Sequence, residues 1–191
     1  MRTMMIYSSL LVICCFVISE QSCLCGGYWY TQEIVCQSKL VIEATIESFL
    51  ENDYYKKYQI SVTKIYKGKG EYDTLTDKTT LETPNSYLVC GALGLKVGSS
   101  YILTASIRNG KMTIITCDLK VEVSKATNTM LEGLAGKYEE NCDCQPPNDF
   151  DEQIVLWRTN KQHCGYPHCR INRDAVCARD KNYQCKMFVI H

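Results

Sequence analysis

Cysteine constrains the fold of this chain more than any other residue type. There are 13 cysteines among 191 residues, and two of them, Cys14 and Cys15, lie in an apolar leader that follows Arg2 and runs from Met4 to Ile18. A positive residue followed by about 15 mostly apolar ones is typical of a secretory signal peptide and is short for a membrane span. We therefore expect a secreted, extracellular chain whose remaining 11 cysteines form a disulfide framework with one cysteine left over.

Two cleavage sites fit the leader. Cleavage after Ser22 removes residues 1–22 and gives Cys23 the free amino group, although Glu20 is unusual at the −3 position. Cleavage after Ser19, with Val17 at −3, fits the rule at least as well and leaves three residues ahead of Cys23. The choice decides whether the α-amine of Cys23 is free or acylated.

The charge balance excludes two classes of partner. The chain has 21 basic and 21 acidic residues and a formal net charge of zero. Neither a nucleic acid nor an anionic membrane is expected to bind such a surface. After the leader, no segment is apolar enough to cross a bilayer.

Most of the remaining chain has the pattern of β-strands. Apolar and polar residues alternate from Lys39 to Phe49, and a β-branched and aromatic run follows from Tyr54 to Gly68. Strand residues on both sides of Asn109-Gly110 predict a tight hairpin, because that pair accepts positive φ angles. We expect five or so strands to close into a small OB-like barrel.

A helix and a break end this barrel region. Apolar residues recur at helical spacing between Ser124 and Asn141, with Ser124, Thr127 or Asn128 as the cap, and Pro146-Pro147 then forms a stiff break. The residues beyond it are too few for an apolar core of their own without disulfides. The predicted organisation is a signal peptide (1–22), a barrel domain with flanking helices (23–142) and a small cysteine-rich, disulfide-stapled C-terminal subdomain (143–191).

The tail contains one cluster that resembles a metal site. In "HCGYPHC", His163, Cys164, His168 and Cys169 lie close together. In an oxidising compartment disulfides are favoured over zinc thiolates, so we expect a stapled loop here. A cysteine nucleophile with a neighbouring histidine would make the chain an enzyme, but no cysteine near a histidine is clearly unpaired, and we expect no enzyme.

The first cysteines after the leader carry the chemistry. In an extended segment, residues two apart point to the same side, so Cys23 and Cys25 can both be anchored while Leu24 projects outward as a single apolar residue on a rigid ridge (residues 23–25). A free α-amine and the carbonyl oxygen of Cys23 would form a five-membered chelate around a metal ion. We expect no cofactor of the chain's own, so the metal would be the catalytic zinc of another protein, which keeps an open coordination position.

Several motifs together resemble the tissue inhibitors of metalloproteinases, which are built on a netrin-like barrel. The motifs are "CLC", "LVIEATI", "YYKKYQISVTKIYKG", "VCG", "IITC" and "KYEENCDC", in this order. The resemblance covers nearly all of the chain from Cys23 to about Cys144 and is weaker beyond it.

The resemblance implies a disulfide pairing and a mechanism. The implied bridges are Cys23 to Cys90, Cys25 to Cys117, Cys36 to Cys142, Cys144 to Cys185, and Cys177 to either Cys164 or Cys169. The cysteine left over would be free or linked to a second chain, and otherwise a monomer is expected. The implied partners are secreted zinc metalloproteases of the matrix-metalloproteinase type, whose zinc Cys23 would chelate through its main-chain N and O.

The resemblance also implies the contact residues. Leu24 would enter the specificity pocket, and Cys25 and Gly26 would continue along the cleft. The other side of the ridge would be flanked by Tyr87, Leu88, Val89 and Gly91. The alternative is a secreted netrin-like module that binds a partner without inhibiting a protease.

Overall fold

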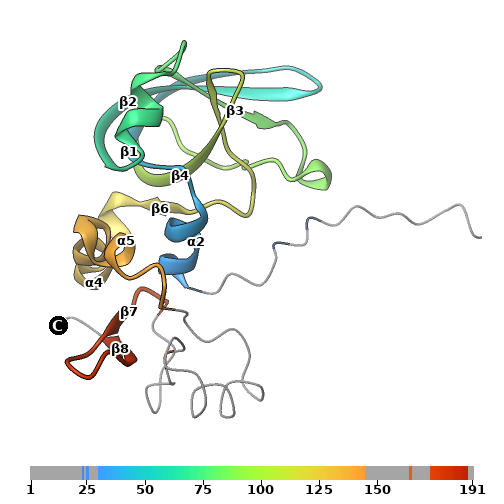
Figure 1. Ribbon diagram of the computed structural model, residues 1–191. Helices are drawn as coiled ribbons and strands as arrows, with labels where there is room; N and C mark the ends of the chain where they lie inside the picture. The colour runs from blue at the N-terminus through green and yellow to red at the C-terminus, as the bar shows by residue number, and fades with distance from the viewer. Residues whose placement is uncertain (1–22, 24, 26–29, 145–163, 165–172, 189–191) are drawn as a thin grey trace, which may run out of the picture.

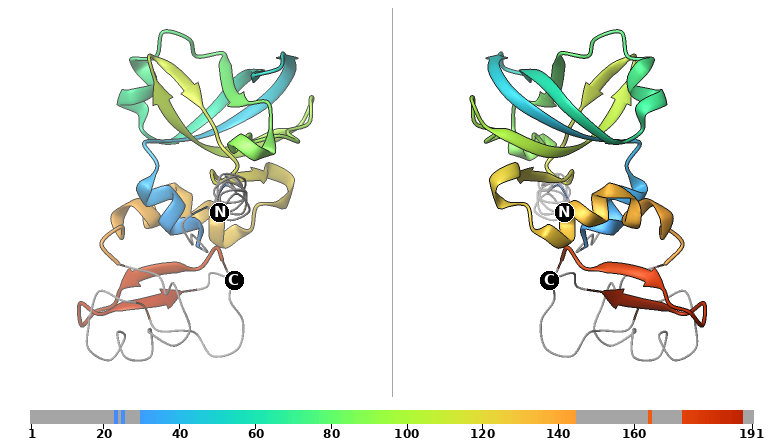
Figure 2. Two further views of the ribbon diagram at one scale, coloured as in Figure 1. Left: turned by 90° about the vertical axis from the view of Figure 1, so that its right-hand side faces the viewer. Right: turned by 90° about the vertical axis from the view of Figure 1, so that its left-hand side faces the viewer.

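The computed structural model describes residues 23, 25, 30–144, 164 and 173–188. They form three tiers, which Figure 1 shows one above another: a β-barrel, a layer of short helices and a two-stranded sheet. The two side views in Figure 2 keep the same order of tiers. The helices of the middle layer therefore lie between the barrel and the C-terminal sheet.

Five strands close the barrel. They are β1 (Leu40–Glu51), β2 (Tyr55–Lys67), β3 (Thr80–Pro84), β4 (Ser100–Arg108) and β5 (Lys111–Thr113). They pair in the ring order β1, β2, β3, β5, β4 and back to β1, and only the β3–β5 pairing within this ring is parallel. A sixth strand, β6 (Lys120–Glu122), pairs with β4. This ring with its flanking helices confirms the predicted mainly β, OB-like fold.

The predicted alternation in β1 sets which residues fill the barrel. Leu40, Ile42 and Ile46 point into the first core cluster and are fully buried. Val41, on the opposite face, is also fully buried, because it belongs to a second cluster formed with the helices. One strand therefore contributes to two cores, since the helical layer covers the outside of the barrel at its first residues.

The end of β2 and the β4–β5 turn, both predicted from the sequence, have the positive φ angles that glycine and asparagine favour. Gly68 ends β2 in the left-handed region, with φ of 78°. Asn109 and Gly110 have φ values of 51° and 74° between β4 and β5, as a tight two-residue hairpin requires. Both predictions are confirmed.

The helical tier is more broken than the apolar pattern indicated. The expected helix at 124–141 consists of η2 (Val123–Lys125), α4 (Asn128–Glu132), a π-helical turn η3 (Gly133–Lys137) and α5 (Tyr138–Glu140). Thr127 caps α4 by accepting a hydrogen bond from the backbone N–H of Met130 at 3.1 Å. Gly136, at φ 136°, interrupts the helix, because only glycine adopts this conformation easily.

The sequence pattern did not indicate two further helices, α2 (Thr31–Gln37) and α3 (Lys69–Asp73). Among the residues that the structure describes, no helix has the length and apolar character needed to cross a membrane.

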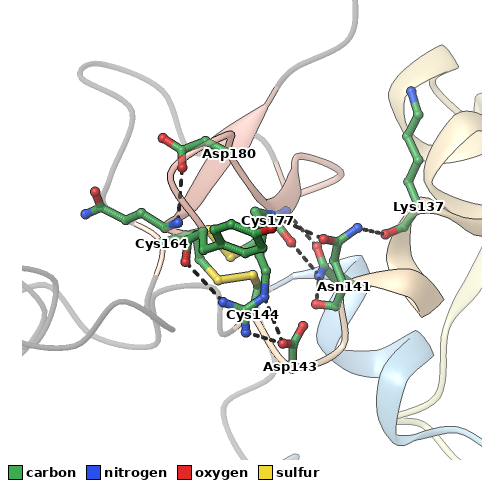
Figure 3. The surroundings of a disulfide bond; sticks show 12 residues. Lys137, Asn141, Asp143, Cys144, Cys164, Cys177 and Asp180 are labelled. Atoms are coloured by element: carbon green, nitrogen blue, oxygen red, sulfur yellow. Dashed lines mark hydrogen bonds and ion pairs between the residues drawn. A yellow bond between two sulfur atoms is a disulfide. The ribbon is translucent and has the colours of Figure 1, made fainter.

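The third tier is a hairpin of β7 (Val176–Arg179) and β8 (Cys185–Phe188). Val176 packs into the helical core cluster, and four cysteines, Cys144, Cys164, Cys177 and Cys185, form a cluster of their own. Figure 3 shows Cys144, Cys164 and Cys177 of this cluster beside Asn141 and Asp143, which follow α5 (Tyr138–Glu140). The hairpin is therefore attached to the helical tier, and the domain boundaries at 23–142 and 143–191 stay a prediction.

Candidate functional site

Two disulfides hold the first described residues against the barrel. Cys23 is bonded to Cys90 and Cys25 to Cys117, with Cα–Cα distances of 5.4 and 5.2 Å. The backbone N–H of Cys25 donates to the carbonyl oxygen of Cys23 at 3.0 Å, a local contact that a fully extended segment would lack. Because a carbonyl oxygen has two lone pairs, this oxygen keeps one for another partner.

The other described disulfides are Cys36–Cys142, Cys144–Cys185 and Cys164–Cys177. All five pairings are among those that the resemblance implied, and Cys164 is the partner of Cys177. The remaining candidates of the site and the tail, namely Leu24, Gly26, His163, His168 and Cys169, lie outside the described residues.

A tight loop beside the ridge presents apolar side chains to solvent. Tyr87, Leu88 and Val89 form the 3₁₀ turn η1 and are 64%, 76% and 52% exposed. Ser86 organises this turn, since its hydroxyl accepts from the N–H of Leu88 at 3.2 Å and its carbonyl accepts from the N–H of Gly91 at 2.8 Å. Large exposed apolar side chains on an ordered loop are typical of a protein interaction site.

Gly91 differs from Tyr87, Leu88 and Val89 because it is buried. A Cβ atom at this position would lie 2.1 Å from the carbonyl oxygen of Pro84 and 2.8 Å from that of Ser86. The loop can therefore close only around glycine. Gly91 shapes the loop through its backbone, next to Cys90, which itself has a positive φ of 65°.

The tip of the β1–β2 hairpin is attached to the same loop. Asn85 donates through its backbone N–H to the carbonyl oxygen of Tyr54 at 2.9 Å and through its side-chain amide to that of Asn52 at 2.6 Å. Tyr54 and Tyr55 are 76% and 53% exposed. The sequence indicates a polar tip at Glu51-Asn52-Asp53 between the two strand-like runs, but it does not single out Asn85, which only the preference of asparagine for turns could have indicated.

A comparison with known protein families identifies the family of this chain. The model of the family "Tissue inhibitor of metalloproteinase" matches residues 21–187. The chain belongs to this family. The chain is also similar to a protein named "Metalloproteinase inhibitor 3" from Xenopus laevis, with 22% identity over 197 residues, which covers 93% of this chain and 89% of that protein.

Membership of the tissue inhibitor of metalloproteinase family confirms two predictions. The resemblance seen in the motifs is correct, and the family is one of inhibitors and not of enzymes. The bond between Cys164 and Cys177 also removes Cys164 as a thiolate ligand from the "HCGYPHC" cluster. Within the described ranges, no three His, Cys, Asp or Glu side chains are placed to hold a metal ion.

Three aromatic residues, Tyr28, Trp29 and Tyr30, precede α2, and the structure describes only Tyr30. Tyr30 is 2% exposed and belongs to the core, whereas Tyr28 and Trp29 lie outside the described residues. The backbone N–H of the next residue, Thr31, donates to the carbonyl oxygen of Arg173 at 2.9 Å. The chain that leaves the ridge is thus held by the C-terminal segment where α2 begins.

Proposed function

We propose that this chain is a secreted inhibitor of zinc metalloproteases of the matrix-metalloproteinase type, and that the ridge is the inhibitory element. The observation that carries the proposal is the attachment of Cys23 and Cys25, two residues apart, to Cys90 and Cys117 at the exposed edge of one barrel. Family membership and the name of the Xenopus relative support the class of target.

The chemistry assigned to Cys23 requires a free α-amine. Its nitrogen and the carbonyl oxygen of the same residue would occupy the open position of the protease's zinc, which otherwise holds the catalytic water. Leu24 would enter the specificity pocket, Cys25 and Gly26 would follow the cleft, and Tyr87, Leu88 and Val89 would line the other side. The zinc belongs to the protease, and the inhibitor supplies two main-chain ligands.

Rigidity is the physical basis of affinity in this proposal. Ordering the backbone of one residue costs about 1–2 kcal/mol, and a flexible peptide meets that cost when it binds. Two bridges that close sequence separations of 67 and 92 residues restrict the ridge before the protease arrives. A substrate-like segment can then bind tightly without being cut.

The α-amine also predicts a pH dependence. Its reference pKa is about 7.7–8.0, and only the neutral amine can bind a metal. Inhibition should therefore weaken as the pH falls from about 8 to about 6. The inhibition constant of the secreted protein, measured against a protease whose own activity is corrected for at each pH, tests this expectation.

The decisive experiment changes only the first residue. Intact mass and N-terminal sequencing of the secreted protein establish whether it begins at Cys23. A variant with one alanine added before Cys23 should keep its fold and lose nearly all inhibition of matrix-metalloproteinase catalytic domains, because the acylated nitrogen is no longer a ligand. Full inhibition by the extended variant would refute the mechanism, and a secreted form that begins at Glu20 would favour the non-inhibitory binding module.

A further inference from the structure

One four-residue turn connects both disulfides of the ridge. This Cys117 turn, Ile115–Asp118, contains the partner of Cys25. The backbone N–H of Thr116 donates to the carbonyl oxygen of Cys90 at 2.8 Å, and Ile115 forms a β-bridge with Gly91. Because Cys90 is bonded to Cys23, any shift of this turn is transmitted to both ends of the ridge.

A carboxylate closes the turn from inside. One oxygen of Asp118 accepts from the backbone N–H of Ile115 at 2.7 Å, and the other accepts from the hydroxyl of Thr104 at 3.3 Å. Thr104 is a fully buried residue of β4, and its hydroxyl oxygen accepts from the N–H of Leu119 at 2.9 Å. The carboxylate thus attaches the turn to a rigid strand of the barrel.

An ammonium group holds the same turn from its carbonyl side. Lys120, at the start of β6, donates from Nζ to the carbonyl oxygen of Thr116 at 2.7 Å and to that of Ile115 at 3.4 Å. Three of the hydrogen bonds made by Asp118 and Lys120 therefore end on the backbone of two adjacent residues. None of these contacts involves a side chain of the ridge itself.

Partial burial disfavours the charged forms of both Asp118 and Lys120. Partial burial raises the pKa of Asp118, although the N–H of Ile115 and the hydroxyl of Thr104 offset part of the shift. Partial burial lowers the pKa of Lys120, and the charge of Asp118 offsets part of that shift. Exposed charges would avoid this desolvation, so the contacts to the turn are the compensating feature of the arrangement.

We infer that Asp118 and Lys120 are positioning residues for inhibition: they hold the Cys117 turn, and through the Cys25–Cys117 bond and the turn's contacts with Cys90 and Gly91 they fix where the main-chain N and O of Cys23 lie. This inference rests on the proposed function, because it assigns these residues a role in zinc chelation that they exert without touching the protease.

The test compares each variant of the Cys117 turn with a control that removes the same kind of side chain from another part of the barrel domain. Asp77 also accepts backbone N–H bonds in a turn, from Thr79 and Thr80 at 2.9 and 3.1 Å, so Asp77→Ala is the control for Asp118→Ala. Lys67 donates to the carbonyl oxygens of Val35 and Cys36 at 2.9 and 3.0 Å, so Lys67→Met is the control for Lys120→Met. All four variants remove a side chain that holds backbone, but only two act on the Cys117 turn.

The readout is affinity for a matrix-metalloproteinase catalytic domain with its catalytic zinc and after that zinc has been removed. Asp118→Ala and Lys120→Met should bind the zinc-containing enzyme about tenfold or more weakly and the zinc-free enzyme unchanged. The two controls should leave both affinities unchanged. Asp118→Asn should restore zinc-dependent affinity, because its amide oxygen can still accept from Ile115.

A purely structural role predicts other results. It would lower the thermal midpoint in all four variants and leave the ratio of the two affinities at the wild-type value, and that outcome would overturn the inference. Hydrogen exchange of the Cys25 amide provides a measurement that needs no protease. Faster exchange in Asp118→Ala than in Asp77→Ala shows that Asp118 holds the ridge, even if the proposed inhibitory function fails, and equal exchange overturns the inference.

Discussion

The two ends of this molecule use disulfides for opposite purposes. At the barrel edge, Cys23, Cys90 and Cys117 are partly exposed and Cys25 is exposed, next to a loop of solvent-facing apolar side chains. At the C-terminal hairpin, four cysteines are at most 3% exposed and form the centre of their own cluster. The first pair of bridges keeps an exposed surface in place, whereas the second pair replaces an apolar core that so few residues cannot build.

The polar contacts around the two regions differ in the same way. The hairpin is attached to the helices by buried groups: Gln32 exchanges hydrogen bonds with both the N–H and the carbonyl of Cys177, and Tyr138 donates to the carbonyl oxygen of Asp174 at 2.6 Å. The edge presents the exposed side chains of Tyr87, Leu88 and Val89, and it is held in place by partly buried groups such as Asp118 and Lys120. Perturbing the hairpin should therefore affect stability, and perturbing the edge should affect inhibition.

The largest difference should come from removing one bridge at each end. Replacing Cys25 and Cys117 together by alanine should weaken inhibition about 100-fold, because two or so residues must then be ordered on binding. Replacing Cys144 and Cys185 together should leave the inhibition constant within about twofold of the wild-type value. Each of the two double variants should lose about 4 kcal/mol of unfolding free energy. Inhibition constants and denaturant unfolding measure the two effects, and equal losses of inhibition would contradict the comparison.

A smaller effect at the edge is expected from Gly91→Ala. The added Cβ would displace the backbone of Pro84 and Ser86, so the Tyr87–Val89 turn should move and inhibition should fall about tenfold. Gly70→Ala is the matched control, because a Cβ atom added at Gly70 would meet no heavy atom within 4 Å. Titration of the protease with each variant gives the comparison, and equal inhibition constants would show that the loop tolerates the shift.

The counterpart at the hairpin is Gln32→Leu. Gln32 is fully buried, and the substitution leaves the N–H and carbonyl of Cys177 and the carbonyl of Asn141 without this partner. Each buried group left unsatisfied costs about 1–3 kcal/mol, so unfolding free energy should fall by about 3 kcal/mol with inhibition unchanged. Gln59→Leu, on the exposed face of β2, is the control that should change neither quantity.

The smallest effect is a pH dependence of stability in the helical tier. Burial raises the pKa of Tyr138 above its usual value near 10, and the carboxylate of Asp174 adds to the shift. The unfolded chain therefore ionises first, so the stabilisation is complete below pH 10 and is lost as the pH rises above it. Tyr138→Phe should flatten this decline in a series of unfolding curves at alkaline pH, and an unchanged decline would show that another group is responsible.

The barrel was predictable from the sequence to the extent that its signals are local. The alternation in β1, the end of β2 at Gly68 and the Asn109-Gly110 hairpin each depend on a few neighbouring residues, and the structure has all three. The short strands β3 and β6 were not predicted. They are five and three residues long, and their pairing depends on partners far along the chain.

The site was predictable only in part for a similar reason. The spacing of Cys23 and Cys25 indicated that both could be anchored, but their partners came from the family resemblance and not from the residues themselves. The roles of Asn85 and Gln32 depend on contacts with residues 33 and 145 positions away. Asp118 closes a local turn with Ile115, but its attachment to the barrel depends on Thr104 in β4. A carboxylate or an amide in a turn is common on any protein surface and does not by itself mark a site.

The sequence separation of the ridge disulfides has a consequence for biosynthesis. The first residues of the proposed inhibitor reach their final geometry only when Cys90 and Cys117 have left the ribosome and been oxidised, because these residues lie 67 and 92 positions from their partners. Such distant contacts form late relative to local ones. Inhibitory activity should therefore appear only after the disulfides of the barrel have formed. A chain truncated before Cys117 would lack the partner of Cys25 and should not inhibit a protease.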